Sequence, residues 1–271
     1  MPAKYLQVDG TALYVVHDGP TTLPGRPPAT GDTGAVLALH DAGRHGWDFS
    51  HVREALGEVV SAPNLIAFDQ PGHGRSGELD SLGDVGRLAD LVRATIRKLE
   101  LTRPVLLGHG LGGAAALRVA LDVPDAAAGV VVMGCGATLP VDDDAYALMQ
   151  RVTEGKARRP FDVGVFAEGT PQEVMRPYFM QGMKTDPRAT FGDMTACRAF
   201  DETARVGELG VPLLVVVGEH ERADVRAAAE ALASTAPNAT LEVVEGAAHA
   251  LPVEASAAVA TLIRGFVEGL A

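Results

Sequence analysis

The fold of this chain is decided by the stretch Arg103-Pro-Val-Leu-Leu-Gly-His-Gly-Leu-Gly-Gly-Ala114. Within it, residues 105–107 are a short apolar run, which is typical of a buried strand. Four glycines follow in residues 108–113, and the alanine-rich residues 114–120 favour a helix. The stretch therefore predicts a strand that turns sharply into a helix.

Gly110 stands at the centre of this turn. A residue there has to adopt a strained conformation with positive φ, which glycine holds without steric cost. The flanking glycines allow the strand and the helix to approach each other closely. Gly110 therefore suits the backbone, but it leaves the turn without a hydroxyl group that could attack a substrate.

Composition and charge narrow the class of protein. Of the 271 residues, 47% are hydrophobic and 21% are charged, which is ordinary for a soluble globular enzyme with one large core. Lysine and arginine number 23 against 35 acidic residues, and the net charge of -12 argues against a nucleic-acid partner. Two cysteines are too few for a disulfide framework. We see neither a signal peptide nor a membrane-spanning run, so we expect a cytoplasmic protein with no membrane partner.

Apolar runs of strand length alternate with helical patterns along most of the chain. We expect strands at residues 4–8, 13–17, 35–39, 64–68, 105–107, 129–133, 211–217 and 241–244, and helices at 47–60, 81–99, 114–121, 222–233 and 252–270. Asp9-Gly10 is a strong hairpin signal, and residues 19–34 predict a surface loop. The alternation predicts an α/β fold: a mostly parallel central sheet with helices on both faces.

Residues 137–205 break this alternation. They are polar and charged, and they hold much of the aromatic content of a chain that is only 5% aromatic. A segment of this length is too long for a plain loop. We therefore expect a helical lid at residues 137–205, inserted into a core formed by residues 1–136 and 206–271. Its aromatic side chains are expected to supply part of the wall of a pocket of roughly a few hundred Å3.

Several motifs resemble those of the α/β-hydrolase family and occur in that family's order. The turn at residues 108–112 resembles the nucleophile elbow G-x-S-x-G, with Gly110 in the place of the serine. Residues 69–76, Asp-Gln-Pro-Gly-His-Gly-Arg-Ser, resemble the D-x-P-G-H-G-x-S turn, and residues 35–47 resemble the oxyanion strand. Residues 215–221 resemble the strand end that carries the acid, and residues 246–254 resemble the histidine loop.

The resemblance implies roles for individual residues. His249 falls on the position of the general base, and Glu221 falls on that of the acid that orients it, with Asp224 as a rival acid. The backbone amides of Ala42 and Leu111 fall on the positions of the oxyanion hole.

Asp41 departs from the family pattern, which has glycine at this position. A carboxylate there either disturbs the oxyanion hole or itself binds the substrate or transfers a proton. Cys135 follows a strand end, where α/β folds bind ligands, and His109 lies in the elbow, so both are candidates for substrate contact. The alternatives are a buried inert cysteine and a structural histidine. We expect His45 and His73 to order their loops.

The sequence contains no spacing typical of a metal site and no phosphate-binding loop, so we expect neither a metal nor a cofactor. The function that we favour is His249-based general acid–base chemistry on a small carbonyl substrate: hydrolysis, cyclisation, dehydration or carbon–carbon cleavage without a serine nucleophile. One alternative is a non-catalytic protein that binds a ligand under its lid. Another is a serine ester hydrolase whose nucleophile has been replaced by Gly110. The sequence does not indicate the oligomeric state.

Overall fold

The computed structural model describes residues 3–20, 22–23, 26, 34–57 and 63–270. The predicted loop at residues 19–34 and the end of the helix predicted at 47–60 lie partly outside these residues. In the described part, eight strands form one sheet in the order β1-β2-β4-β3-β5-β6-β7-β8. The strands are β1 Ala3–Val8, β2 Thr11–Val16, β3 Ala35–Leu39, β4 Asn64–Phe68, β5 Val105–His109, β6 Gly129–Met133, β7 Leu213–Gly218 and β8 Ala239–Val244.

The sheet is parallel from β4 through β8, and the hairpin β1–β2 pairs antiparallel to its edge. The parallel strands are connected by α1 Ser50–Gly57, α2 Val85–Lys98, α3 Leu111–Asp122 and α7 Ala223–Thr235, and the last strand is followed by α8 Leu251–Glu254 and α9 Ser256–Gly269. The predicted α/β fold is therefore confirmed.

Two apolar layers cover the two faces of the sheet. Successive strand residues point to opposite faces, so Leu106 of β5 belongs to the core cluster beneath α2 and α3. Its neighbours Val105 and Leu107 belong to the cluster beneath α1 and α9. Both faces are buried, which explains why the parallel strands are apolar throughout and do not alternate with polar residues.

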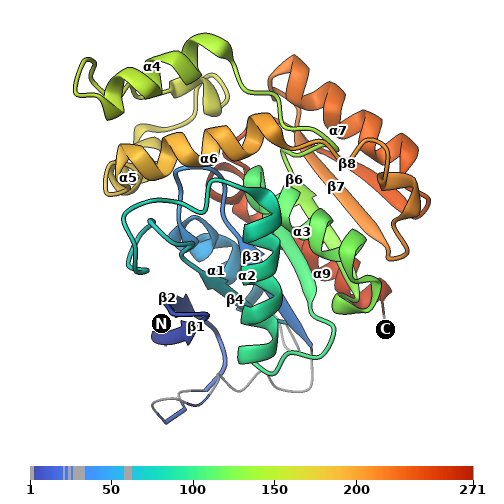
Figure 1. Cartoon of the computed structure of the whole chain (residues 1–271). Helices are drawn as coiled ribbons and strands as arrows, with labels where there is room; N and C mark the ends of the chain where they lie inside the picture. The colour runs from blue at the N-terminus through green and yellow to red at the C-terminus, as the bar shows by residue number, and fades with distance from the viewer. Residues whose placement is uncertain (1–2, 21, 24–25, 27–33, 58–62, 271) are drawn as a thin grey trace.

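The segment between β6 and β7 contains three helices, α4 Asp143–Thr153, α5 Gln172–Gly182 and α6 Pro187–Ala199. Figure 1 shows these helices together across one end of the sheet. We refer to residues 137–205 as the inserted segment. Short 3-10 helices complete the described elements: η1 Gly46–Phe49, η2 Pro124–Ala126, η3 Val163–Val165 and η4 Val206–Glu208.

Among the predicted helices, three differ most from the structure in their bounds. The first is divided into η1 and α1, because the chain begins with a tight 3-10 turn before the α-helix. The second begins at Val85 and not at residue 81, because the Asp84 carboxylate accepts the amide hydrogen of Arg87 and caps the helix there. The last is interrupted at Ala255, between α8 and α9. Within the described residues, no helix combines the length and apolarity that crossing a membrane requires.

Candidate active site

The elbow at the end of β5 has the predicted form. Gly110 lies between β5 and α3 with φ 47° and ψ -114°, a conformation that favours glycine. A Cβ added to Gly108 would overlap the backbone of Gly112, and one added to Gly112 would overlap the backbone of Leu39. The glycines are therefore required by the close approach of β3, β5 and α3.

The carboxylate of Asp41 fills the space above Gly110. A Cβ added to Gly110 would overlap Asp41 Oδ1. The same oxygen accepts the amide hydrogen of Leu111 at 2.9 Å. Asp41 thus presents an acidic group from the end of β3 at the point where the elbow residue would project its own side chain.

His249 lies between two carboxylates. Its Nδ1 is 2.7 Å from Glu221 Oε2, and its Nε2 is 3.1 Å from Asp41 Oδ2. The contact with Nδ1 is therefore made by Glu221, the residue at the predicted position of the acid. The rival Asp224 instead pairs with Arg222, at 2.5 and 3.2 Å.

These contacts fix the charge of the three groups. Burial alone would lower the pKa of His249, but the hydrogen bonds and charges of Asp41 and Glu221 outweigh it and raise the pKa to about 10. Burial would raise the pKa of both carboxyl groups, but their contacts with His249 hold each below its usual range. At neutral pH the site therefore contains an imidazolium ion between two carboxylates.

The predicted oxyanion hole needs a correction. The sequence predicts two amides free to bind a substrate oxygen, at Ala42 and Leu111. In the structure the Leu111 amide already donates to Asp41 Oδ1, so it is not free to bind a substrate oxygen. The Ala42 residue lies at the wall of the cavity above the elbow, as do Asp41, Leu111 and His249.

The structure does not place His109 and Cys135 at the cavity wall, where the predicted substrate contacts would need them. His109 is 1% exposed, and its Nε2 donates to the backbone carbonyl of His249 at 2.8 Å, so it supports the histidine loop from below. Cys135 is fully buried, its Sγ contacts the carbonyl of Gly136, and burial raises the pKa of its thiol. Neither side chain lines the cavity, and the contacts of both are those of structural groups.

Three potential metal ligands come together where the sequence spacing indicated none. Donor atoms of Asp41, His109 and His249 lie within 4.8 Å of one another. These donors are already engaged inside the protein: both nitrogens of His249 contact carboxylates, and His109 Nε2 donates to a carbonyl group. The arrangement therefore favours proton transfer between the groups themselves.

A cavity of about 630 Å3 lies above these residues, between the end of the sheet and the inserted segment. Phe161, Tyr178 and Phe179 contribute to its wall, which agrees with the expected aromatic lining. The remaining aromatics of the inserted segment do not line it; Tyr146 and Phe191, for example, pack against each other.

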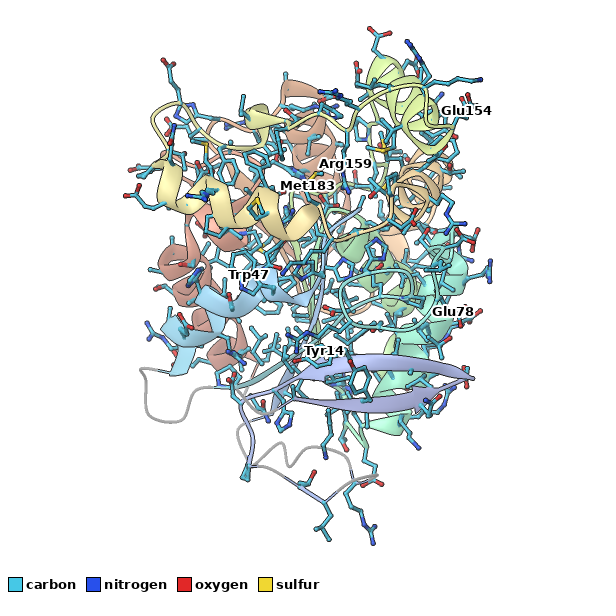
Figure 2. All side chains as sticks on the ribbon, turned by 90° about the vertical axis from the view of Figure 1, so that its left-hand side faces the viewer. Tyr14, Trp47, Glu78, Glu154, Arg159 and Met183 are labelled. Carbon is cyan, nitrogen blue, oxygen red and sulfur yellow. The ribbon has the colours of Figure 1, made fainter. Side chains whose placement is uncertain are left out.

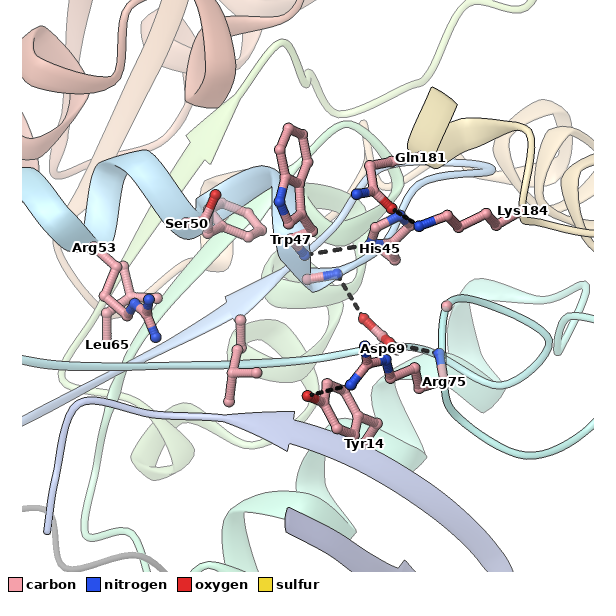
Figure 3. A pocket seen from close by; sticks show the side chains of 15 residues that line it. Tyr14, His45, Trp47, Ser50, Arg53, Leu65, Asp69, Arg75, Gln181 and Lys184 are labelled. Carbon is pink, nitrogen blue, oxygen red and sulfur yellow. Dashed lines mark hydrogen bonds between the residues drawn. The ribbon is translucent and has the colours of Figure 1, made fainter. Parts of the chain in front are cut away.

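A second cavity, of about 210 Å3, is bordered by β2, β4, η1, α1 and α5 (Figure 3). Asp69 projects into this region, where its carboxylate accepts the amide hydrogens of Gly46 and Arg75, each at 2.8 Å. His45 caps η1 by accepting the amide hydrogen of Trp47, which fits its expected role in ordering the loop. Of the groups predicted to be catalytic, Asp41, Gly110 and His249 line the larger cavity, and Glu221 lines neither.

Two supporting acids were missed by the sequence analysis. Glu254, the last residue of the histidine loop, accepts the amide hydrogens of Ala248 and Ala167, both at 2.8 Å, and so joins that loop to the inserted segment. Asp193 of α6 is 2% exposed; its Oδ2 accepts the amide hydrogen of Gly43 at 2.9 Å and lies 2.9 Å from His73 Nε2. Nothing in the local sequence of Asp193 distinguishes it from a solvated helix residue, because its partners are more than a hundred residues away.

We expect Asp193→Ala to lower the free energy of unfolding by about 3 kcal/mol, because it leaves the buried Nε2 of His73 and the Gly43 amide without their partner. Urea denaturation followed by circular dichroism measures this loss. Asp186→Ala, at the N-cap of the same helix, is the control and should cost about 1 kcal/mol. Equal losses in the two variants would show that Asp193 does not join α6 to the core.

Comparison with known proteins agrees with this fold. The model of the alpha/beta hydrolase family matches residues 36–262, and the chain therefore belongs to that family. Over 202 residues the chain is 24% identical to a 2-hydroxy-6-oxononadienedioate/2-hydroxy-6-oxononatrienedioate hydrolase of Pseudomonas sp, covering 69% of this chain and 71% of that protein. Over 232 residues it is 27% identical to a non-heme chloroperoxidase of Burkholderia pyrrocinia, covering 76% and 84%.

Solved structures show the same fold. An esterase from Thermogutta terrifontis superposes with a TM-score of 0.82 at 21% identity, covering 100% of this chain and 99% of that chain. The enol-lactonase from Burkholderia xenovorans LB400 also has a TM-score of 0.82, at 19% identity, covering 98% of this chain and 100% of that chain.

Proposed function

We propose that this protein is an enzyme that moves protons on a small carbonyl substrate without forming a covalent serine intermediate. The observation that carries the proposal is the place of Asp41, whose carboxylate fills the elbow and contacts both the Leu111 amide and His249. Relatives that are hydrolases, and a fold shared with an enol-lactonase, support an enzyme acting on small carbonyl compounds.

The charges of His249 and Asp41 support a different assignment of the acid and the base from the sequence-based hypothesis, in which His249 is the base. Because His249 carries two protons at rest, it is suited to donate one, and the ionised Asp41 is suited to accept one. In the proposed step, Asp41 Oδ2 removes a proton from the carbon next to the carbonyl group. His249 Nε2 gives its proton to the carbonyl oxygen, so the products are an enol, a protonated Asp41 and a neutral His249.

An enol is a common intermediate of several reactions that the sequence leaves open. Dehydration, ring closure and carbon–carbon cleavage can each proceed from it. Direct hydrolysis needs Asp41 to deprotonate a water molecule while His249 gives its proton to the carbonyl oxygen. Glu221 keeps His249 oriented throughout, through the hydrogen bond to Nδ1. We also propose that the inserted segment acts as a lid, which excludes bulk water from the cavity and so strengthens these electrostatic contacts.

The two alternatives receive less support. A serine hydrolase that had lost only its nucleophile would keep space for the serine side chain, whereas Asp41 fills that space. A protein that only binds a ligand has no use for a histidine held between two carboxylates.

Proton exchange tests the proposal directly. The wild-type protein should catalyse exchange of the α-protons of small keto acids and of their amides in D2O, followed by proton NMR. His249→Ala should reduce this exchange by roughly a hundredfold or more. Asp224→Asn, next to the acid but paired with Arg222, is the matched control and should leave the rate unchanged. Equal exchange by the wild type and His249→Ala would contradict the proposal.

The charge assignment also predicts the pH dependence. If His249 is the acid, kcat/KM should be constant through neutral pH and should fall as the pH rises through about 10, where the imidazolium loses its proton. Because the pKa of Asp41 is lowered, the acid limb should appear only below the usual range of carboxyl groups. A rate that instead rises with the titration of an ordinary histidine would show that neutral His249 is the base.

A further inference from the structure

Three arginines line the cavity beneath the inserted segment: Arg44, Arg159 and Arg222. Two of them are neutralised by a carboxylate. Arg44 donates two hydrogen bonds of 2.7 Å to Asp48, and Arg222 pairs with Asp224. Arg159 forms no ion pair with any carboxylate in the described part of the chain. Its positive charge is therefore not balanced by the protein.

Neutral groups hold the guanidinium of Arg159 in place. Its Nη1 donates to the backbone carbonyls of Gly182 and Thr185 at 2.9 and 3.0 Å, and its Nη2 donates to Thr190 Oγ1 at 3.2 Å. Its Nε has no acceptor among the residues that the structure describes. Burial and the charge of Arg44 lower the pKa of Arg159, so an anion beside it would stabilise its charged form.

Arg159 belongs to the same part of the cavity as Asp41. Its partner Thr190 lies against Gly43, since a Cβ on Gly43 would be 2.8 Å from the Thr190 side chain. Gly43 follows Asp41 by two residues. A ligand that reached both the guanidinium and Asp41 would therefore need only a short chain between its two polar ends.

The rest of the cavity wall is mainly apolar. Besides Asp41 it includes two aspartates, and both have structural roles. Apolar side chains of the inserted segment border the cavity, among them Leu148, Met149, Phe161, Phe179, Met183 and Met194. Asp142 and Asp162 also line it, but each accepts a backbone amide hydrogen at the start of a helix, from Ala145 and Gly164. Figure 2 shows Arg159 and Met183 in the inserted segment, with Trp47 below them on the side of the sheet.

We propose that this cavity binds a short organic acid whose carboxylate pairs with Arg159. The apolar part of the ligand lies along the side chains of the inserted segment, and its carbonyl group reaches Asp41 and His249. The position of the carbonyl rests on the proposed function. The pairing of the carboxylate with Arg159 is independent of the proposed function, because a ligand can bind there without reacting.

Calorimetric titration of the full chain tests the pairing with matched ligands. We would use levulinate, 5-oxohexanoate and 4-phenylbutyrate, each beside its primary amide, which has the same shape without the charge. We expect at least one acid to bind about tenfold or more tightly than its amide, as a charge-assisted hydrogen bond gives. Arg159→Gln should abolish the preference and leave the affinity for the amide unchanged, whereas Arg159→Lys should keep part of it.

Arg222→Gln is the control, since it removes a paired arginine of the same cavity and should leave the preference intact. Thermal unfolding of each variant confirms that the inserted segment remains folded. Acids and amides that bind equally to the wild type, or acids that do not bind at all, would overturn the proposal, and so would a preference that survives Arg159→Gln. If the protein bound acids more tightly than their amides but did not catalyse proton exchange, only the catalytic proposal would be rejected.

Discussion

Asp41→Asn should reduce proton exchange by roughly a hundredfold or more, because it removes the base while keeping the shape of the side chain. The amide also takes away one of the two negative charges beside His249. The pKa of His249 should therefore fall from about 10 towards that of an ordinary histidine. Exchange rates measure the first effect, and a 15N NMR titration of the imidazole measures the second.

The two readouts separate a chemical role of Asp41 from a merely structural one. Glu221→Gln is the matched comparison, because it also removes one charge from His249 but leaves the carboxylate at the elbow. Both variants should lower the pKa of His249, while Asp41→Asn should have the larger effect on the rate. A similar loss in both would indicate that Asp41 acts only through His249 and is not the base.

The elements of the fold could be predicted because they depend on local sequence. The strand Val105–His109 and the turn around Gly110 are specified by an apolar run and by glycines that no other residue could replace. The pairing of His249 with Glu221 could be expected from the family motifs, since the order of the strands brings both loops to one edge of the sheet.

The chemistry of the site could not be predicted in the same way. Whether Asp41 points at the elbow depends on the conformation of a single side chain, and the spacing of residues does not determine it. The charge of His249 depends in turn on that contact. Arg159 could not be singled out either, because its lack of an acidic partner is a property of packing within the inserted segment.

Gly110→Ser should fail to give a serine hydrolase, although it restores the elbow motif. The Cβ of the new serine would overlap Asp41 Oδ1, and the positive φ of this position is strained for any residue with a side chain. The strain alone is expected to cost about 1–3 kcal/mol. His249 is moreover protonated and cannot accept the proton of the hydroxyl group. We therefore expect no labelling by serine-directed phosphonylating probes and a lower melting temperature.

Adding Asp41→Gly to Gly110→Ser should reverse this result. The glycine frees the space above the elbow and the Leu111 amide, which can then bind an oxyanion. It also leaves His249 with Glu221 as its only carboxylate partner, so that its pKa falls and neutral His249 can activate the serine. The double variant should react with phosphonylating probes and hydrolyse p-nitrophenyl esters, and His249→Ala should abolish both activities.

Asp41→Gly alone is the control. It has the space above the elbow but no hydroxyl group, so it should remain unlabelled. Strong labelling of Gly110→Ser alone would mean that Asp41 does not occupy the elbow, and would favour a serine hydrolase that lacks only its nucleophile.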